Sequence, residues 1–155
     1  MNFYIVIPAH NEGKNITQTL KSLVNQKLKP KKLILVDDNS SDNTGQIIND
    51  FTKRFNWIKK VVNKSSSAHL PGAKIINAFY AGYETLDDHY DVLCKFDADI
   101  VFEPDYLSKL KIHFENNPCL GMVAGVCYIK KEKDWILENL NRNDHIRGAL
   151  KAYRK

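Results

Sequence analysis

The 155-residue sequence has few cysteines and no long hydrophobic run. Its three cysteines, Cys94, Cys119 and Cys127, form no C-x-x-C pair. A reduced, cytosolic setting is therefore favoured over a disulfide framework, with all three expected as small buried residues. The longest apolar runs, such as 92–94 and 121–126, are far too short to span a bilayer. The first residues carry no basic segment before their apolar run, so no secretory signal is expected.

Two common phosphate-binding motifs are also missing. The sequence contains no G-x-x-x-x-G-K-[S/T], which excludes a P-loop in practice. It contains no G-x-G-x-x-G either, which disfavours dinucleotide redox binding.

The composition is that of one folded globular domain, with 43% hydrophobic and 26% charged residues. The formal net charge is +5, and residues 130–155 carry eight basic and four acidic side chains. A nucleic-acid-binding protein usually shows a broad basic face, so no nucleic-acid partner is expected. Three interpretations of this basic segment stay open: it faces the phosphates of a ligand, it faces an anionic membrane surface, or it is a solvated tail.

Strand and helix patterns alternate along the chain, which predicts an α/β fold. Strands are expected at 3–7, 33–36, 57–62, 92–96 and 120–129, and helices at 14–25, 47–55, 72–83 and 104–114. A short helix is expected at 135–140, and 145–153 fits either a strand or a helix. Such alternation implies a mostly parallel central sheet with helices on both faces. Ligands of such sheets bind at the carboxyl ends of the strands.

Three polar clusters directly follow three of the expected strands. They are 8–12 (PAHNE), 37–42 (DDNSSD) and 97–99 (DAD). In a parallel sheet these clusters meet at one edge, which predicts a binding site there.

The two carboxylates of Asp97 and Asp99 form the sharpest cluster. We expect the two acids not to hold one ion equally but to take different roles. One would bind a divalent cation and the other a sugar hydroxyl or a water. Mg²⁺ and Mn²⁺ prefer a few carboxylates together with phosphate oxygens and waters.

Two further features have both a structural and a functional interpretation. Asp37 and Asp38 end a buried strand, where either acid can cap the following helix or accept a hydrogen bond from a nucleoside. Gly72 and Lys74 can present helix N–H groups and an ammonium to phosphate, or can form a plain helix start.

The clusters occur in the order and spacing of a known family. The stretches IVIPAHNEGKNI, LILVDDNSSDNT, PGAKIINAFYAGYE and CKFDADIVFEPDYL resemble the family 2 glycosyltransferases of the GT-A fold. The resemblance covers residues 3–129 and implies a Rossmann-like nucleotide-diphospho-sugar transferase fold. It divides the chain into a nucleotide-sugar-binding domain at 1–129 and the start of an incomplete acceptor-side region at 130–155.

The resemblance also implies roles for single residues. Those matched to the donor nucleotide are Pro8, Ala9, His10, Glu12, Asp38, Gly72, Lys74 and Asp97. Within that set, Asp38 matches the residue that binds the base, and Asp97 is placed near the ribose or sugar. Asp99 matches the residue that contacts Mg²⁺ or Mn²⁺.

The expected reaction is transfer of a sugar from a nucleoside diphosphate donor with inversion at the anomeric carbon. A UDP-sugar is expected as the donor because it is common in the family. The resemblance implies a saccharide or lipid-linked acceptor, polysaccharide or cell-wall synthesis, and work in the cytoplasm at the inner face of the membrane. The catalytic base is expected after Lys155, since within the chain only Glu138 and Asp144 are candidates. Two alternatives stay open: a sugar nucleotidyltransferase and a non-catalytic nucleotide-binding module.

Overall fold

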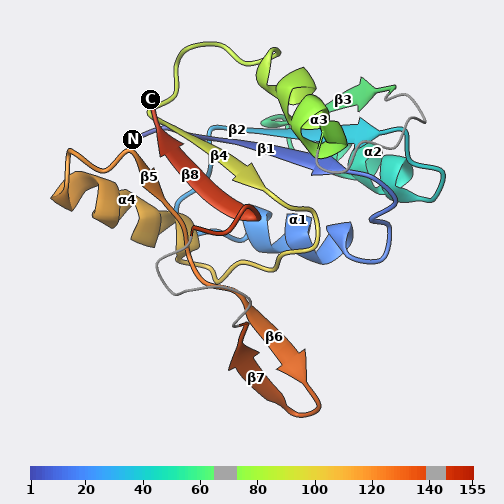
Figure 1. Cartoon of the computed structure of the whole chain (residues 1–155). Coiled ribbons are helices and arrows are strands. Elements are labelled where there is room, and N and C mark those ends of the chain that lie inside the picture. The colour runs from blue at the N-terminus through green and yellow to red at the C-terminus, as the bar shows by residue number, and fades with distance from the viewer. Residues whose placement is uncertain (65–72, 139–145) are drawn as a thin grey trace.

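The computed structural model describes residues 1–64, 73–138 and 146–155 (Figure 1). Its helices are α1 (Ile16–Val24), α2 (Thr44–Arg54), α3 (Ala73–Tyr83) and α4 (Tyr106–Asn116). Its strands are β1 (Phe3–Ala9), β2 (Lys32–Asp38), β3 (Ile58–Asn63), β4 (Val92–Phe96), β5 (Met122–Val123), β6 (Tyr128–Lys131), β7 (Asp134–Leu137) and β8 (Leu150–Arg154).

A six-stranded sheet with the order β3-β2-β1-β4-β8-β5 forms the centre of the fold. The strands β3, β2, β1 and β4 are parallel, whereas β8 runs antiparallel to both β4 and β5. The prediction of a mostly parallel α/β sheet is confirmed. The strands β6 and β7 form a separate two-stranded hairpin.

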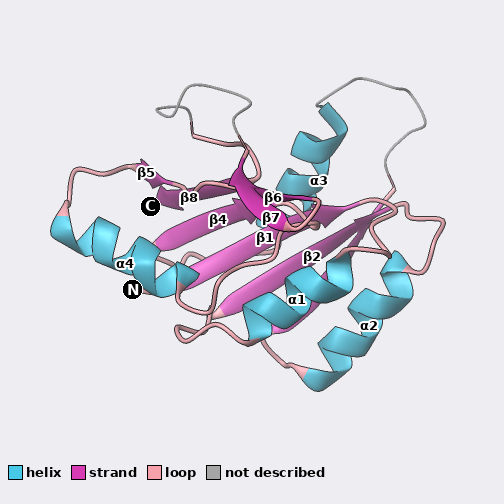
Figure 2. Ribbon diagram, turned by 90° about the horizontal axis from the view of Figure 1, so that it is seen from below, coloured by secondary structure: helices cyan, strands magenta, loops and turns pink. Residues whose placement is uncertain are grey.

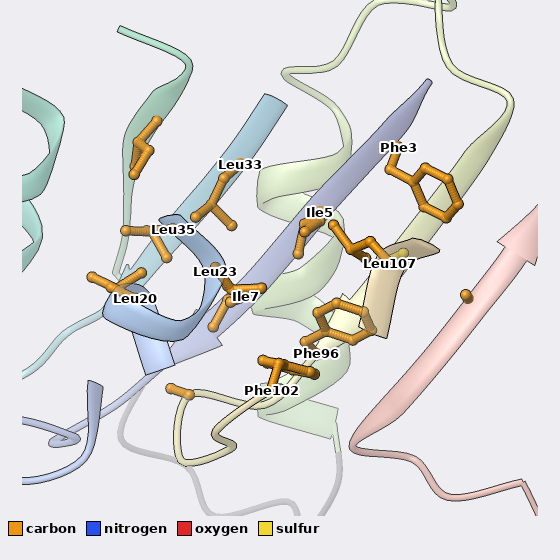
Figure 3. Packing of buried hydrophobic residues seen from close by; sticks show 14 of the residues in the cluster. Phe3, Ile5, Ile7, Leu20, Leu23, Leu33, Leu35, Phe96, Phe102 and Leu107 are labelled. Atoms are coloured by element: carbon orange, nitrogen blue, oxygen red, sulfur yellow. The ribbon is translucent and has the colours of Figure 1, made fainter. Parts of the chain in front are cut away.

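Helices cover both faces of the sheet, as predicted (Figure 2). Alternate residues of β1 explain this arrangement, because successive side chains of a strand point to opposite faces. Phe3, Ile5 and Ile7 enter the larger core, which they share with α1, α2 and α4 (Figure 3). Tyr4 and Val6 enter a smaller core with Ala78 of α3.

The helix α3 approaches the sheet closely at Gly82. A Cβ atom built on Gly82 would lie 2.6 Å from Val36 Cγ2 and 2.7 Å from Val6 Cγ1. The substitution Gly82→Ala is therefore expected to lower the free energy of unfolding by about 1 to 2 kcal/mol, because overpacking outweighs the gain in helix propensity. Urea unfolding measures this change. Gly121→Ala is the control, since a Cβ at Gly121 meets nothing within 4 Å and its effect should stay within about 0.5 kcal/mol.

Two expected elements differ in the structure. The predicted strand at 120–129 is divided into β5 and β6. The chain passes close to Tyr106 between them: Gly125 N–H donates to the Tyr106 hydroxyl (3.2 Å), and a Cβ at Gly125 would lie 2.8 Å from the Tyr106 ring. The predicted helix at 135–140 is wrong for its described part, because Asp134–Leu137 pairs with β6 as a strand.

Some predicted burial is also wrong. Cys94 is buried, but Cys119 is exposed and Cys127 is half-buried. The large side chains of Ile76 and Tyr80 in α3 are exposed. Within the described ranges, no helix has the length and apolar character needed to cross a membrane.

Candidate functional site

The carboxyl ends of β1, β2 and β4 lie next to one another, because β1 pairs with both other strands. Ala9 pairs with Asp37 of β2, and Val6 pairs with Lys95 of β4. Asp38 ends β2, and Asp97 follows β4 directly. Neighbouring strands lie about 4.8 Å apart and β1 lies between β2 and β4, so the main chain at Asp38 and at Asp97 is separated across the sheet by about 10 Å. The predicted meeting of the three polar clusters at one edge is thus seen in the fold.

The loops after β1 and β2 are joined by hydrogen bonds. Asn11 N–H donates to Ser40 Oγ (3.1 Å), and Ser41 N–H donates to Asn11 Oδ1 (2.8 Å). Gly13 N–H donates to Asp42 Oδ2 (2.9 Å). A Cβ at Gly13 would lie 1.8 Å from a side-chain oxygen of Asn43, so a larger residue would separate the two loops. These contacts hold the first two clusters as one surface.

Asp37 has a structural role. Its Oδ2 forms an ion pair with Lys60 Nζ (3.0 Å), and its Oδ1 accepts the Ser40 N–H (3.2 Å). Burial alone would raise the pKa of Asp37, but the hydrogen bonds from Ser40 and Lys60 outweigh it and hold that pKa below its ordinary value. Asp37 therefore binds the following loop and β3, and caps no helix; the Thr44 N–H of α2 is accepted by Asp42 instead (2.9 Å).

Asp37→Asn is expected to lower the free energy of unfolding by about 1 to 3 kcal/mol at neutral pH, because it leaves the partly buried Lys60 without its counter-charge. A pKa lowered by folding gives stability above the unfolded pKa, near 3.9, that is lost as the pH falls below it. The difference in the free energy of unfolding between wild type and variant should therefore be smaller at about pH 3 than at neutral pH. Urea unfolding at both pH values tests this, and an equal difference at both would contradict it.

Asp38 differs from Asp37 in its partners. It is 5% exposed, and its Oδ1 accepts a hydrogen bond from Asn63 Nδ2 (2.8 Å) at the end of β3. Its main-chain oxygen lies 2.7 Å from His10 Nδ1. A carbonyl oxygen only accepts, so His10 donates from Nδ1, which fixes the exposed imidazole beside Asp38. A carboxylate in this setting is suited to accept hydrogen bonds from a neutral ligand.

The D-x-D segment is anchored through its middle residue. Ala98 is buried, and its carbonyl oxygen accepts the hydroxyl of buried Thr19 of α1 (2.7 Å). Asp97 N–H donates to Ala149 O (3.0 Å). The flanking carboxylates are consequently held at the surface, Asp97 partly exposed and Asp99 exposed.

The two acids of this segment have different surroundings. Asp97 forms an ion pair with Lys95, whose ammonium also donates to Gly148 O (3.2 Å). In the described part of the chain, no ion pair engages Asp99. Asp97 is thus partly neutralised by its own chain, whereas Asp99 presents a carboxylate to solvent.

The residues at this edge fit a hard divalent cation. Carboxylate oxygens are the ligands that Mg²⁺ and Mn²⁺ prefer, and Mg²⁺ commonly takes one or two of them plus substrate phosphates and waters. Across residues 1–64, 73–138 and 146–155, no group of three or more His, Cys, Asp or Glu residues converges as a closed metal cage. One exposed carboxylate beside a partly neutralised one matches the open type of site.

The remaining predicted site residues are placed as follows. Pro8 and Ala9 are buried in the last part of β1. Glu12 is half-buried, and its main-chain oxygen accepts the Ile16 N–H at the start of α1 (2.9 Å). Lys74 is half-buried in the first turn of α3, the next described element after β3. Gly72 lies outside the described residues.

Of the two candidate bases inside the chain, Asp144 also lies outside the described residues. The carboxylate of Glu138 forms an ion pair with Arg147, whose guanidinium also donates to the Glu138 main-chain oxygen. Glu138 is therefore committed to a structural contact.

Three residues at this edge were missed by the sequence reasoning: Asn63, Lys95 and Arg147. Asn63 follows the predicted strand 57–62 by one residue, and its polar type at a strand end was the available signal. Lys95 lies two residues before Asp97, and a basic residue so close to the two acids was the available local signal. Arg147 gave no such signal, because it precedes β8, whose place beside β4 is set by long-range pairing.

The sequence is similar to those of bacterial proteins named as a glycosyltransferase or a polysaccharide synthase. Over 123 residues it is 37% identical to "Probable glycosyltransferase YdaM" of Bacillus subtilis, covering 78% of this chain and 28% of that protein. Over 122 residues it is 32% identical to a poly-beta-1,6-N-acetyl-D-glucosamine synthase of Staphylococcus epidermidis, covering 77% of this chain and 27% of that protein. The chain thus spans little more than a quarter of the length of these relatives.

Solved structures share the fold at low identity. The mannosyltransferase PcManGT of Pyrobaculum calidifontis, in complex with GDP-Man and Mn²⁺, superposes with a TM-score of 0.71 at 15% identity, over 99% of this chain and 44% of that one. TarS 1-349 of S. aureus, in complex with UDP-GlcNAc, superposes with a TM-score of 0.66 at 19% identity, over 99% of this chain and 45% of that one. A 4-diphosphocytidyl-2C-methyl-D-erythritol synthase of Anaerococcus prevotii superposes with a TM-score of 0.59 at 15% identity, over 99% of this chain and 70% of that one.

The fold alone is therefore shared by a mannosyltransferase and by a 4-diphosphocytidyl-2C-methyl-D-erythritol synthase. The family is decided by sequence, because the model of the glycosyl transferase family 2 matches residues 4–154, nearly the whole chain. The protein belongs to the family 2 glycosyltransferases and has their GT-A fold.

Proposed function

We propose that this chain binds a nucleoside diphosphate sugar, with a UDP-sugar preferred, and serves its transfer to an acceptor hydroxyl with inversion. One observation carries the proposal: Asp38 at the end of β2 and Asp99 just after β4 lie at the same edge of the sheet, and β2 and β4 are the two strands that flank β1. The preference for UDP is supported by the relatives named for N-acetylglucosamine transfer and by the UDP-GlcNAc complex of TarS.

Asp38 receives the base in this proposal. Uracil carries one N–H donor on the edge that it presents to hydrogen-bonding partners, and a buried carboxylate oxygen is a strong acceptor for it. Asn63 holds the Asp38 carboxylate, and its amide is a second group able to bind the base. His10, Pro8, Ala9 and Glu12 lie on β1 and its following loop, which we place along the base and ribose.

Asp99 and Asp97 receive the other end of the donor. Asp99 would hold Mg²⁺ or Mn²⁺ together with the diphosphate, and Asp97 would accept a hydroxyl of the ribose or sugar. When bound, the metal neutralises the charge that develops on the departing diphosphate. Lys74, in the first turn of α3, adds an ammonium and a helix N-terminus, both of which favour phosphate.

Inversion requires an acceptor hydroxyl to attack the anomeric carbon from the face opposite the diphosphate, with a base to take its proton. Glu138 does not fit this role because Arg147 holds its carboxylate. We propose a saccharide or a lipid-linked saccharide as the acceptor.

Titration calorimetry with UDP, GDP and a nucleoside triphosphate, each with and without Mn²⁺, tests the proposal. UDP is expected to bind in a Mn²⁺-dependent manner and more tightly than GDP. Tighter binding of the triphosphate would favour a nucleotidyltransferase, and failure of the folded chain to bind any nucleotide would contradict the proposal.

A further inference from the structure

The hairpin of β6 and β7 presents large apolar side chains to solvent. Every residue from 128 to 137 is exposed, including Trp135 at 67% and Tyr128 at 57% (Figure 1 shows the hairpin projecting from the body). Its two-residue turn is built with Glu132 at a positive φ of 52°. Exposed apolar surface of this kind usually marks an interaction site.

The aromatic side chains of the hairpin share one face. Tyr128 pairs with Leu137, and Lys130 pairs with Trp135. Paired residues, and residues two apart on one strand, project to the same side of a ladder. This face, which we call the aromatic face (Tyr128, Lys130, Trp135 and Leu137), therefore combines two rings, one aliphatic side chain and one ammonium. The opposite face holds the pairs Ile129–Ile136 and Lys131–Asp134.

The base of the hairpin is attached beside the D-x-D segment. Glu138 N–H donates to Cys127 O (2.9 Å), which closes the hairpin, and Arg147 binds Glu138. The residues that follow Arg147 contact the D-x-D segment, since Lys95 donates to Gly148 O (3.2 Å) and Asp97 donates to Ala149 O (3.0 Å).

Electrostatics support the same placement. Burial raises the pKa of the Cys127 thiol, Arg147 lowers it, and Glu138, Asp99 and Asp97 raise it further. Cys127 is therefore close enough to sense both acids of the D-x-D segment. The hairpin rises from the edge of the sheet at which the donor phosphates are proposed to bind.

We propose that the aromatic face of the β6–β7 hairpin is a stacking platform for the acceptor saccharide. This inference rests on the proposed function. A pyranose ring has faces lined by C–H bonds, which pack on an aromatic ring while the hydroxyl groups stay hydrated. Tyr and Trp suit such a ligand because each combines a large apolar ring with a polar atom. Lys130, on the same face, can donate to a sugar hydroxyl.

Two other occupants fit the hairpin less well. An anionic membrane usually attracts clusters of four or more basic residues, whereas 128–137 has three lysines against two acids. A stable second copy needs about 800 Å² of buried surface on each partner, which is more than one face of a ten-residue hairpin offers. A short saccharide matches the size of the aromatic face and the near-neutral charge of the hairpin.

Tryptophan fluorescence tests the platform directly. The chain has two tryptophans, and Trp57 directly precedes β3, at the amino-terminal end of that strand and so opposite the edge that carries the site. In a Trp57→Phe background, Trp135 is the sole reporter. With UDP and Mn²⁺ present, titration with chitotetraose, cellotetraose or gentiotetraose is expected to give a saturable blue shift with at least one of them.

Titration calorimetry with the saccharide that gives the shift then compares the affinities of matched variants. Trp135→Ala or Tyr128→Ala should weaken its binding by about tenfold, the size of an interface hot spot. Ile129→Ser, on the opposite face, should leave it within about twofold. All three variants should bind UDP and Mn²⁺ as wild type does, which shows that they are folded.

Three results would overturn the platform. The first is no emission shift with any of the three saccharides while UDP still binds, which leaves the proposed function intact. The second is a shift with phosphatidylserine vesicles and none with saccharides, which identifies a membrane contact. The third is a shift that depends on protein concentration alone, which identifies a second copy. Loss of UDP binding by the wild-type chain would overturn the proposed function itself.

Discussion

Asp99→Asn is expected to abolish the Mn²⁺-dependent part of UDP binding, weakening affinity by about 100-fold or more, or about 2.7 kcal/mol. The physical reason is that Asp99 presents an exposed carboxylate at the edge of the sheet, whereas Lys95 already neutralises its neighbour Asp97. An amide retains the shape of the carboxylate but loses the charge that attracts a divalent cation. Titration calorimetry with and without Mn²⁺ measures the effect.

Pyrophosphate with Mn²⁺ is an informative second ligand, because it contains the phosphate end of the donor without the base. Asp99→Asn should weaken its binding as strongly as it weakens UDP binding. Asp50→Asn, which changes an exposed acid of α2 away from the edge, is the matched control and should change neither affinity. Wild-type affinity of Asp99→Asn for UDP in the presence of Mn²⁺ would contradict the assignment of the metal.

Asp38→Asn is expected to weaken UDP binding by about 10- to 100-fold, with or without Mn²⁺. The carboxylate is almost fully buried and is held by Asn63, so it offers a fixed acceptor to a base N–H. In the variant, one oxygen becomes an NH₂ donor that opposes the donor of the base. Binding of pyrophosphate with Mn²⁺ should be unchanged, which separates this base-end effect from the phosphate-end effect of Asp99→Asn.

The neighbouring acid supplies the control for this prediction. Asp37→Asn changes the same side chain one residue away, but Asp37 is bound to Lys60 and Ser40. It should lower stability and leave the UDP affinity of the folded protein nearly unchanged. Equal losses of UDP affinity in the two variants would show that either substitution weakens binding by disturbing the edge of the sheet, and would contradict a direct contact between Asp38 and the base.

Much of the fold could be predicted because its elements have strong local patterns. The apolar run of β1 and the spacing of Ile16, Leu20 and Leu23 in α1 each identify an element without reference to the rest of the chain. The region after residue 120 lacks such patterns. There β5 has two residues and, among the described strands, β6 pairs with β7 alone, so pairing between strands decides the structure.

The candidate site was predictable to the extent that it depends on strand order. Asp38 and Asp99 each follow a buried strand, and a parallel sheet brings such ends together. The contacts that distinguish Asp38 from Asp37, and Asp97 from Asp99, were not predictable. Two of them come from Asn63 and Lys60 of β3, a strand that local sequence does not place next to the acids. The third comes from Lys95, which lies two residues before Asp97 and four before Asp99, so that sequence spacing alone does not show which acid it pairs with.

The proposed function depends most on one bound nucleotide contacting both Asp38 and the metal held by Asp99. A crystal structure of the chain with UDP and Mn²⁺, with the anomalous signal of manganese recorded, tests this most directly. We predict a manganese peak about 2 Å from an Asp99 carboxylate oxygen, with the diphosphate on the metal and the uracil in hydrogen-bond contact with Asp38. A manganese peak away from Asp99, or a uracil bound elsewhere than at Asp38, would contradict it.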